Sequence, residues 1–191
     1  MPRIVNRIEI ARDIGDVYDF VTTPATWLDW HPSTCRLTGH WCRPLCTGDR
    51  VTEEFRAFGV RHRVDWTIIE SQPPRRWVAA GRHSGGGATL MYTLERLPAG
   101  TLLNGLFAYR SDGLWRSLID GLVVRQRLAA ESREAVLRLK RLMEQQSGAG
   151  DQDACGETDN RAGLSRRTCP PGTAAGSEGL EFVEVDARNL L

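Results

Sequence analysis

The order of predicted elements constrains this chain most. Residues 3–11 alternate like a strand, two short helices follow, and six further strand patterns precede one long amphipathic helix predicted over residues 113–146. A helix of that length, roughly 50 Å at about 1.5 Å per residue, needs a broad apolar surface to lie on. Its apolar side is predicted from residues at three- and four-residue steps: Leu118, Ile119, Leu122, Ala129, Val136, Leu139 and Met143.

The strand patterns can supply that surface. They fall at residues 35–41, 50–58, 60–70, 76–83, 88–96 and 101–110, and the links between them are short and rich in Gly and Pro. Short links make antiparallel hairpins, because parallel neighbours need a crossover of a dozen or more residues. The sequence therefore predicts an α+β fold in which a curved antiparallel sheet of about seven strands wraps one long helix. A cavity between the two would hold a small hydrophobic molecule.

The two helices after the first strand have their own signals. Asp13 is a good N-cap, and Val17, Phe20 and Val21 give the following helix an apolar stripe. Pro24 is expected to end it, and a second helix over residues 25–30 is expected to stop before Pro32.

The composition changes beyond residue 146. Residues 1–146 carry 21 Lys and Arg against 16 Asp and Glu, whereas residues 147–191 carry 4 against 8 and hold seven glycines. We therefore expect one domain over 1–146 and an acidic, disordered tail over 147–191. The arginines of the body form no run, which argues against nucleic-acid binding. Without an apolar stretch long enough for a membrane helix or signal peptide, a cytoplasmic protein with no membrane insertion is expected.

Five cysteines form an odd number in a chain without an export signal, so reduced thiols are expected. A zinc site among His31, Cys35, His40, Cys42 and Cys46 was weighed, but the spacing matches no usual zinc template. The sequence carries no phosphate loop, nucleophile elbow or dinucleotide fingerprint. We expect no metal and no cofactor.

Several local motifs resemble one superfamily. They are the opening residues 8–21, the segment 26–32, Gly48-Asp49 before a strand, and the segment from Trp66 to Trp77 with its Pro-Pro turn. Over residues 3–146 the chain resembles the helix-grip (SRPBCC) superfamily, which includes START domains, the major birch-pollen allergen and bacterial polyketide cyclase/dehydrase proteins. The resemblance implies a helix-grip fold that binds lipids, polyketides or similar molecules, with cyclisation or dehydration in some members. It carries over no catalytic motif.

Strand alternation predicts which side chains face the cavity. If residues 58–59 form a two-residue turn, Phe55 lies opposite His62 and Glu53 opposite Val64, so that Glu53 and His62 become diagonal neighbours. A carboxylate and an imidazole among apolar walls suit proton transfer. Two alternatives to a catalytic role remain. Glu53 and His62 form a hydrogen-bonded polar pair without catalytic function, or a register shifted by one residue turns both side chains to solvent.

Other residues are expected to line the cavity. Tyr92 faces inward by alternation, and its hydroxyl could orient a ligand carbonyl. Trp30 lies where the helix pair meets the sheet, either gating the cavity or packing the helices. In residues 76–83 either the Trp77 set or the set containing Arg82 faces inward, and the sequence leaves this open. The expected ligand contacts are Trp30, Phe55, Val64, Trp66, Tyr92, Phe107, Tyr109, Leu118 and Leu122.

Three functions remain open. The first is binding of a hydrophobic small molecule such as a polyketide, lipid or quinone. The second is a cyclase or dehydratase with Glu53, His62 and Tyr92 as acid–base candidates, and the third is a protein-interaction module modulated by the acidic tail. Whether the chain is an enzyme, which ligand it binds and its oligomeric state stay open at this level.

Overall fold

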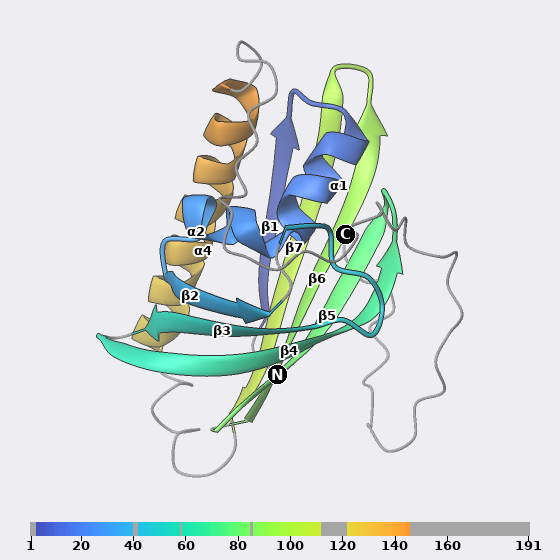
Figure 1. Ribbon diagram of the computed structural model, residues 1–191. Helices are drawn as coiled ribbons and strands as arrows, with labels where there is room; N and C mark the ends of the chain where they lie inside the picture. The colour runs from blue at the N-terminus through green and yellow to red at the C-terminus, as the bar shows by residue number, and fades with distance from the viewer. Residues whose placement is uncertain (1–2, 40–41, 58, 85, 112–121, 146–191) are drawn as a thin grey trace.

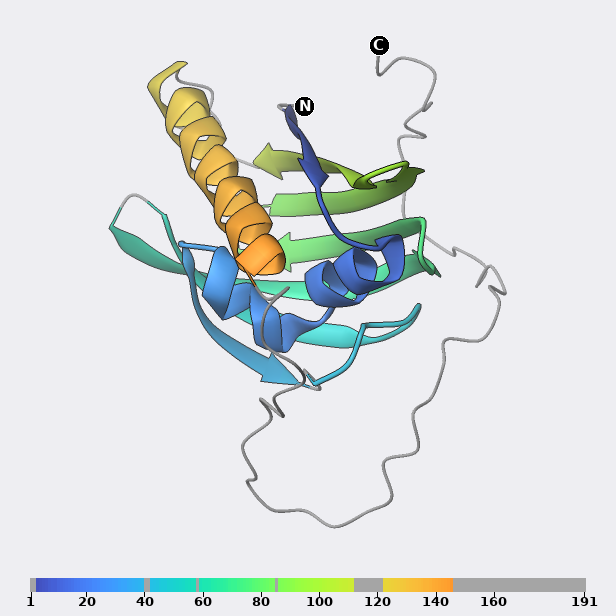
Figure 2. The same ribbon diagram turned by 90° about the horizontal axis from the view of Figure 1, so that it is seen from above.

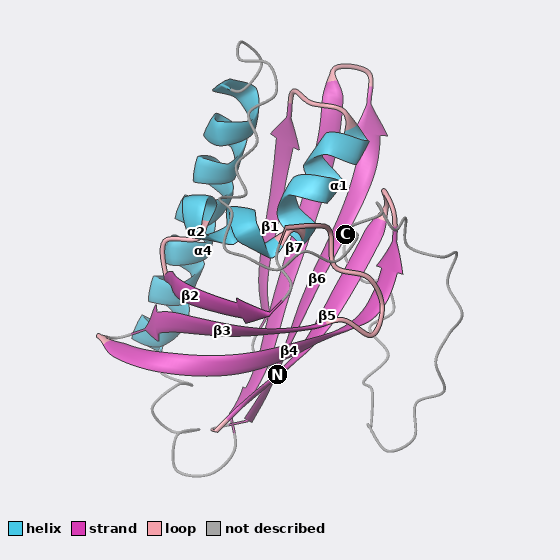
Figure 3. Cartoon of the chain, viewed as in Figure 1, coloured by secondary structure: helices cyan, strands magenta, loops and turns pink. Residues whose placement is uncertain are grey.

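The computed structural model describes residues 3–39, 42–57, 59–84, 86–111 and 122–145. It is an α+β helix-grip fold in which one sheet carries helices on a single face (Figures 1 and 3). In chain order the elements are β1 (Arg3–Ile10), α1 (Ile14–Thr22), α2 (Pro24–Trp30), β2 (Thr34–Gly39), β3 (Arg50–Ala57), β4 (Val60–Gln72), β5 (Arg76–His83), β6 (Gly86–Leu97), β7 (Gly100–Ser111) and α4 (Leu122–Gln145).

The sheet has seven strands in the order β1-β7-β6-β5-β4-β3-β2, and every neighbouring pair is antiparallel. Strands β2 to β7 follow one another as a meander, whereas β1 pairs with β7 at the opposite edge from β2. Helices α1 and α2 carry the chain from one edge to the other. Figure 2 shows that they and α4 lie on the same side of the curved sheet.

The predicted start of α1 is confirmed. The side chain of Asp13 accepts a hydrogen bond from the Gly15 amide over 2.8 Å, which satisfies one of the free amides of the first turn. Pro24 separates the two helices as expected, but it does so as the first residue of α2, where its missing N–H costs no hydrogen bond.

The core packs between the three helices and the concave face of the sheet. Trp77 of β5 is fully buried, donates from Nε1 to the Leu45 carbonyl over 3.1 Å, and stacks on Tyr92 at 5.8 Å between ring centroids. Tyr18 of α1 shares a 2.9 Å hydrogen bond with Ser71 of β4. The buried rings of Trp77 and Tyr18 thus have their polar atoms hydrogen-bonded, as large buried aromatic side chains usually do.

Helix α4 is fastened along β1 by polar contacts as well as by packing. Arg12 donates to the Met143 carbonyl over 2.6 Å, and Lys140 donates to the Glu9 carbonyl over 2.7 Å. Ala135, Leu139 and Met143 are buried against the sheet side of the helix. Among the described helices, none is long and apolar enough to cross a membrane.

The fold class predicted from the sequence is confirmed, and most strands fall within two residues of their predicted bounds. The predicted apolar side of the long helix was partly wrong. Ala129, which was placed on it, is exposed, whereas Ala135, which was not, is buried. The part of the long helix predicted before residue 122 lies outside the described residues. The predicted tail over 147–191, with the interaction role attached to it, also lies outside them.

The structure settles the inward face of β5. Trp77 and Ala79 are buried in the main core, whereas Val78 belongs to a separate cluster of buried residues and Arg82 is exposed. The hairpin register pairs Arg82 with Gly87 and so turns the Trp77 set towards the helices. The alternative in which the set containing Arg82 faces inward is therefore excluded.

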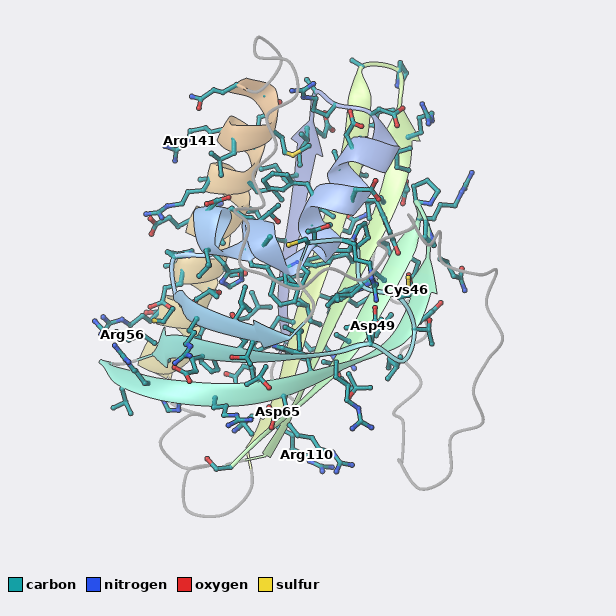
Figure 4. The ribbon with its side chains drawn as sticks, in the orientation of Figure 1. Cys46, Asp49, Arg56, Asp65, Arg110 and Arg141 are labelled. Atoms are coloured by element: carbon teal, nitrogen blue, oxygen red, sulfur yellow. The ribbon has the colours of Figure 1, made fainter. Side chains whose placement is uncertain are left out.

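The expectation of reduced thiols was wrong for two of the described cysteines. Cys42 and Cys46 are disulfide-bonded, whereas Cys35 is free and exposed. They flank a loop whose shape is set by the ion pair of Arg43 with Asp49, at 2.6 Å, and Figure 4 shows Cys46 close to Asp49. Whether two sulfur atoms meet depends on such tertiary geometry, which spacing in the sequence does not supply.

Gly81 is needed because Trp66 lies over it. A Cβ at position 81 would sit 2.7 Å from Trp66 Cζ3 and 2.9 Å from Val64 Cγ2. We expect Gly81→Ala to lower the free energy of unfolding by about 1–3 kcal/mol, as overpacking of a core does. Urea denaturation would measure it. The control is Gly87→Ala, whose Cβ would meet its nearest atom at an ordinary 3.6 Å, and an equal loss in both variants would contradict the role of Gly81.

Candidate ligand-binding site

A partly open cavity of about 140 Å³ lies between the concave face of the sheet and helix α4. Its floor comes from strands at both ends of the sheet, its wall from α2 and the residues after it, and its roof from α4. The lining residues are Ile4, Asn6, Trp27, Trp30, His31, Ser33, Glu53, Phe55, Arg56, Ala57, Trp66, Leu90, Tyr92, Leu103, Gly105, Leu106, Phe107, Leu128, Glu131, Ser132, Ala135 and Val136.

The buried acidic side chain of the cavity is Glu53, which is 9% exposed. Thr34 Oγ1 on β2 donates to its Oε1 over 2.5 Å, and Trp66 Nε1 on β4 donates to its Oε2 over 2.9 Å. One donor therefore comes from each neighbouring strand, and together they hold the carboxylate in one orientation. Each oxygen keeps capacity for a further hydrogen bond from a ligand.

His31 follows α2 and lines the cavity near Glu53. Its Nδ1 lies 3.3 Å from Ser33 Oγ, and its ring meets Trp30 edge-on at 5.1 Å between centroids. Burial lowers the pKa of the imidazole, although the charges of Glu53 and Glu131 act in the opposite direction. The folded protein therefore holds a neutral imidazole at the cavity wall at neutral pH, able to accept a proton.

Two hydrogen-bond donors in the lining have no partner among the described residues. Trp30 is 2% exposed, and its Nε1–H is buried without an acceptor. The Tyr92 hydroxyl likewise has no described partner, and burial, with a smaller contribution from Glu53, raises the pKa of Tyr92 above its usual range. Both groups stay protonated at neutral pH, and a ligand oxygen would satisfy them.

The α4 side of the cavity combines small and polar residues. Ala135 is 1% exposed, and its short side chain leaves room above the floor. Ser132 accepts a hydrogen bond from Asn6 Nδ2 on β1, which ties the roof to the sheet edge. Glu131 brings a second carboxylate, 3.8 Å from the Arg127 guanidinium.

The structure brings five of the nine expected ligand contacts together in the lining: Trp30, Phe55, Trp66, Tyr92 and Phe107. Val64 and Tyr109 are buried but do not line the cavity, since Val64 packs in the core and Tyr109 stacks on Phe107 at 5.8 Å. Leu118 lies outside the described residues. Leu122 begins α4, and its side chain is not described.

The strand register proposed for the acid–base pair is the one observed, with Phe55 opposite His62 and Glu53 opposite Val64. The two polar side chains nevertheless differ in surroundings. Glu53 is held by Thr34 and Trp66, whereas His62 stacks on Phe55 at 5.4 Å between centroids and does not line the cavity. Diagonal position on a sheet does not bring these groups into contact, because the indole of Trp66 takes the place beside the carboxylate.

The imidazole that the fold places near Glu53 is His31, which we considered from the sequence only as a candidate zinc ligand. Glu131, Ser132 and Ala135 were also missed, because they continue the buried face of α4 only in the correct helical phase. Tracing that face backwards from Leu139 and Met143 would have found them. Among the described residues, no group of three or more His, Cys, Asp and Glu is arranged to hold a metal ion.

Comparison with known proteins points to one family. Residues 1–144 match the sequence model of a family described as "Polyketide cyclase / dehydrase and lipid transport". Among curated proteins, no significant relative was found.

Solved structures share the fold at low sequence identity. A Chromobacterium violaceum protein matches with a TM-score of 0.60 at 19% identity, covering 74% of this chain and 96% of that one. A START superfamily protein from Mycobacterium smegmatis matches with a TM-score of 0.61 at 12% identity, covering 76% of this chain and 99% of that one. The di-domain ARO/CYC StfQ of the steffimycin biosynthetic pathway matches with a TM-score of 0.62 at 14% identity, covering 77% of this chain and 52% of that one.

The lowered pKa of His31 predicts a pH dependence of stability. Because the unfolded chain binds this proton at a higher pH than the folded protein does, stability falls as the pH decreases through the unfolded-state value near 6.5. We expect His31→Gln to lose less stability than the wild type between pH 7.5 and pH 5 in urea denaturation. If the stability of the two proteins changes equally with pH, protonation of the His31 imidazole does not destabilise the folded protein, and the prediction is wrong.

Proposed function

Because the chain belongs to the polyketide cyclase/dehydrase and lipid transport family, we propose that it binds a compact hydrophobic molecule between the sheet and α4. The observation that carries the proposal is the cavity between sheet and helix, whose walls are largely aromatic and aliphatic. Concave, mostly apolar sites with a few converging polar groups are typical of small-molecule binding. Trp30, Phe55, Tyr92 and Phe107 supply contact surface, and the unpartnered donors give orientation.

The size of the cavity narrows the ligand class. Its volume of about 140 Å³ is close to that of an apolar protein cavity of about 150 Å³ that holds benzene. A single ring with a short substituent fits such a space, whereas a long acyl chain does not. A one-ring, quinone-like or small polyketide-type molecule is therefore favoured over a lipid.

Filling the cavity from its roof tests this proposal. Ala135→Leu places a larger side chain where the helix faces the cavity, while Ala130→Leu makes the same change at an exposed position of α4. With a panel of one-ring aromatic ligands, we expect Ala135→Leu to weaken binding by about tenfold or more, because the added methyl groups occupy ligand space. Isothermal titration calorimetry would measure the affinities.

Ala130→Leu should bind like the wild type. If neither the panel nor native mass spectrometry of the gently purified protein shows a bound molecule, the proposal is wrong. Equal weakening in the two variants would place the binding elsewhere on the protein.

A second function, proton transfer on the bound molecule, is favoured by one observation. A neutral imidazole, His31, and a protonated hydroxyl, Tyr92, line the same cavity. In this proposal His31 takes a proton from the carbon next to a ligand carbonyl, and the electron pair of that C–H bond moves to the carbonyl oxygen. Tyr92 donates a hydrogen bond to that oxygen. Enolisation of this kind is the first step of an aldol-type cyclisation.

Deuterium exchange tests this second function without knowledge of the natural substrate. In D₂O, the wild type should exchange the methyl protons of acetophenone faster than the same concentration of free imidazole does, as followed by proton NMR. His31→Gln should reduce the excess rate by about 100-fold or more, the scale of general-base catalysis. His62→Gln, which alters a residue outside the cavity lining, should leave it unchanged, and loss of exchange in that variant instead would reassign the base.

A further inference from the structure

The cavity combines an aromatic wall with a carboxylate that lacks an opposite charge. Its lining includes six aromatic rings besides the His31 imidazole: Trp27, Trp30, Phe55, Trp66, Tyr92 and Phe107. Glu53 lies among them and is 9% exposed. Aromatic faces carry negative electrostatic potential and attract organic cations. Ring faces and a carboxylate thus favour the same sign of ligand charge.

The hydrogen-bond partners of Glu53 are neutral. Thr34 and Trp66 orient the carboxylate, but neither brings a positive charge, and no described Lys or Arg forms a salt bridge with it. A buried carboxylate loses its hydration, and neutral donors replace that hydration only in part. A cation in the cavity would complete the pair.

The basic residues of the lining do not fill this role. Burial lowers the pKa of His31, which keeps the imidazole neutral at neutral pH. Arg56 also lines the cavity, but its residue is exposed and no described salt bridge joins it to Glu53. The other carboxylate of the lining, Glu131 from α4, is paired with Arg127 at 3.8 Å. Glu53 is therefore the buried carboxylate of the lining that has no described basic partner.

We propose that the site is selective for a small protonated amine, with the ammonium group against Glu53 and the apolar body among the aromatic rings. This inference rests on the proposed binding function and names its ligand class. The cavity volume admits a one-ring arylalkylamine or a compact alkylamine. A protonated amine offers N–H donors to the free lone pairs of Glu53 and a cation to the ring faces, and these two interactions reinforce each other in a desolvated site.

Benzylamine and benzyl alcohol are a matched pair of probes for this proposal. They have the same number of non-hydrogen atoms and nearly the same shape, but the amine is protonated at pH 7 and the alcohol is neutral. We expect the wild type to bind benzylamine about tenfold or more tightly than benzyl alcohol in isothermal titration calorimetry, and benzoate more weakly than both. Raising the ionic strength should reduce this preference only slightly, because Glu53 is buried and buried charge pairs are screened less than exposed ones.

Glu53→Gln removes the charge and keeps the shape. The glutamine amide still accepts from Trp66 and can donate to the Thr34 hydroxyl, so the local hydrogen bonds persist. Binding of benzylamine should fall by about tenfold or more, while binding of benzyl alcohol should change by less than about twofold. Glu54→Gln, one residue along β3 and absent from the lining, is the control and should leave both affinities unchanged.

The outcomes separate this inference from the binding function it rests on. If benzyl alcohol binds at least as tightly as benzylamine, or if Glu53→Gln weakens both probes equally, the cavity binds ligands but not as a cation site, and the inference is wrong. If neither probe binds and no other one-ring ligand does, the binding function itself is wrong. Retained binding of benzyl alcohol by Glu53→Gln shows that the variant is folded and that the cavity is intact.

Discussion

The structure depends on covering the apolar concave face of one curved sheet. Seven antiparallel strands expose Trp77, Ile68 and Leu103 on that face, and three helices bury them. The cover is uneven. Around Trp77 the rings and helix side chains fill the interior, whereas below α4, where the short side chains of Ser132 and Ala135 face the sheet, a cavity remains. The same hydrophobic burial that folds the chain therefore also shapes the site. The site lies where helix side chains no longer fill the space over the concave face of the sheet.

The chemistry of the cavity follows from which polar groups this burial leaves without partners. Glu53 is held by donors from both neighbouring strands, while the indole N–H of Trp30 and the hydroxyl of Tyr92 have no described acceptor. Buried polar groups are normally satisfied, so open donors beside an oriented carboxylate indicate a site built to receive a molecule with its own polar groups. Ligand binding accounts for all three groups together. Proton transfer draws in addition on the neutral imidazole of His31.

Much of the fold could be predicted because local rules decided it. Asp13 caps α1, the short links force antiparallel hairpins, and the pairing of Ala57 with Val60 fixes the register that places Glu53 opposite Val64. The candidate site was predictable only in part. Alternation along the strands placed Phe55, Trp66 and Tyr92 on the correct face. It did not distinguish the ring that fills the core from the ring that faces the cavity, since both kinds point to the same side of the sheet.

The partners of each side chain were decided by contacts between residues far apart in the chain. Periodicity and turn residues establish which elements form and which face each presents, because these properties depend on neighbours a few positions away. His31 and Glu131 meet the cavity beside Glu53 only after α2 and α4 pack over the strands, and His62, although correctly placed on its strand, is left to stack on Phe55. The disulfide bonding of Cys42 and of Cys46, and the space below α4, arise in the same way. Short-range patterns therefore specify the fold, whereas three-dimensional packing determines the site, since contact, burial and cavity volume exist only between elements that have already come together.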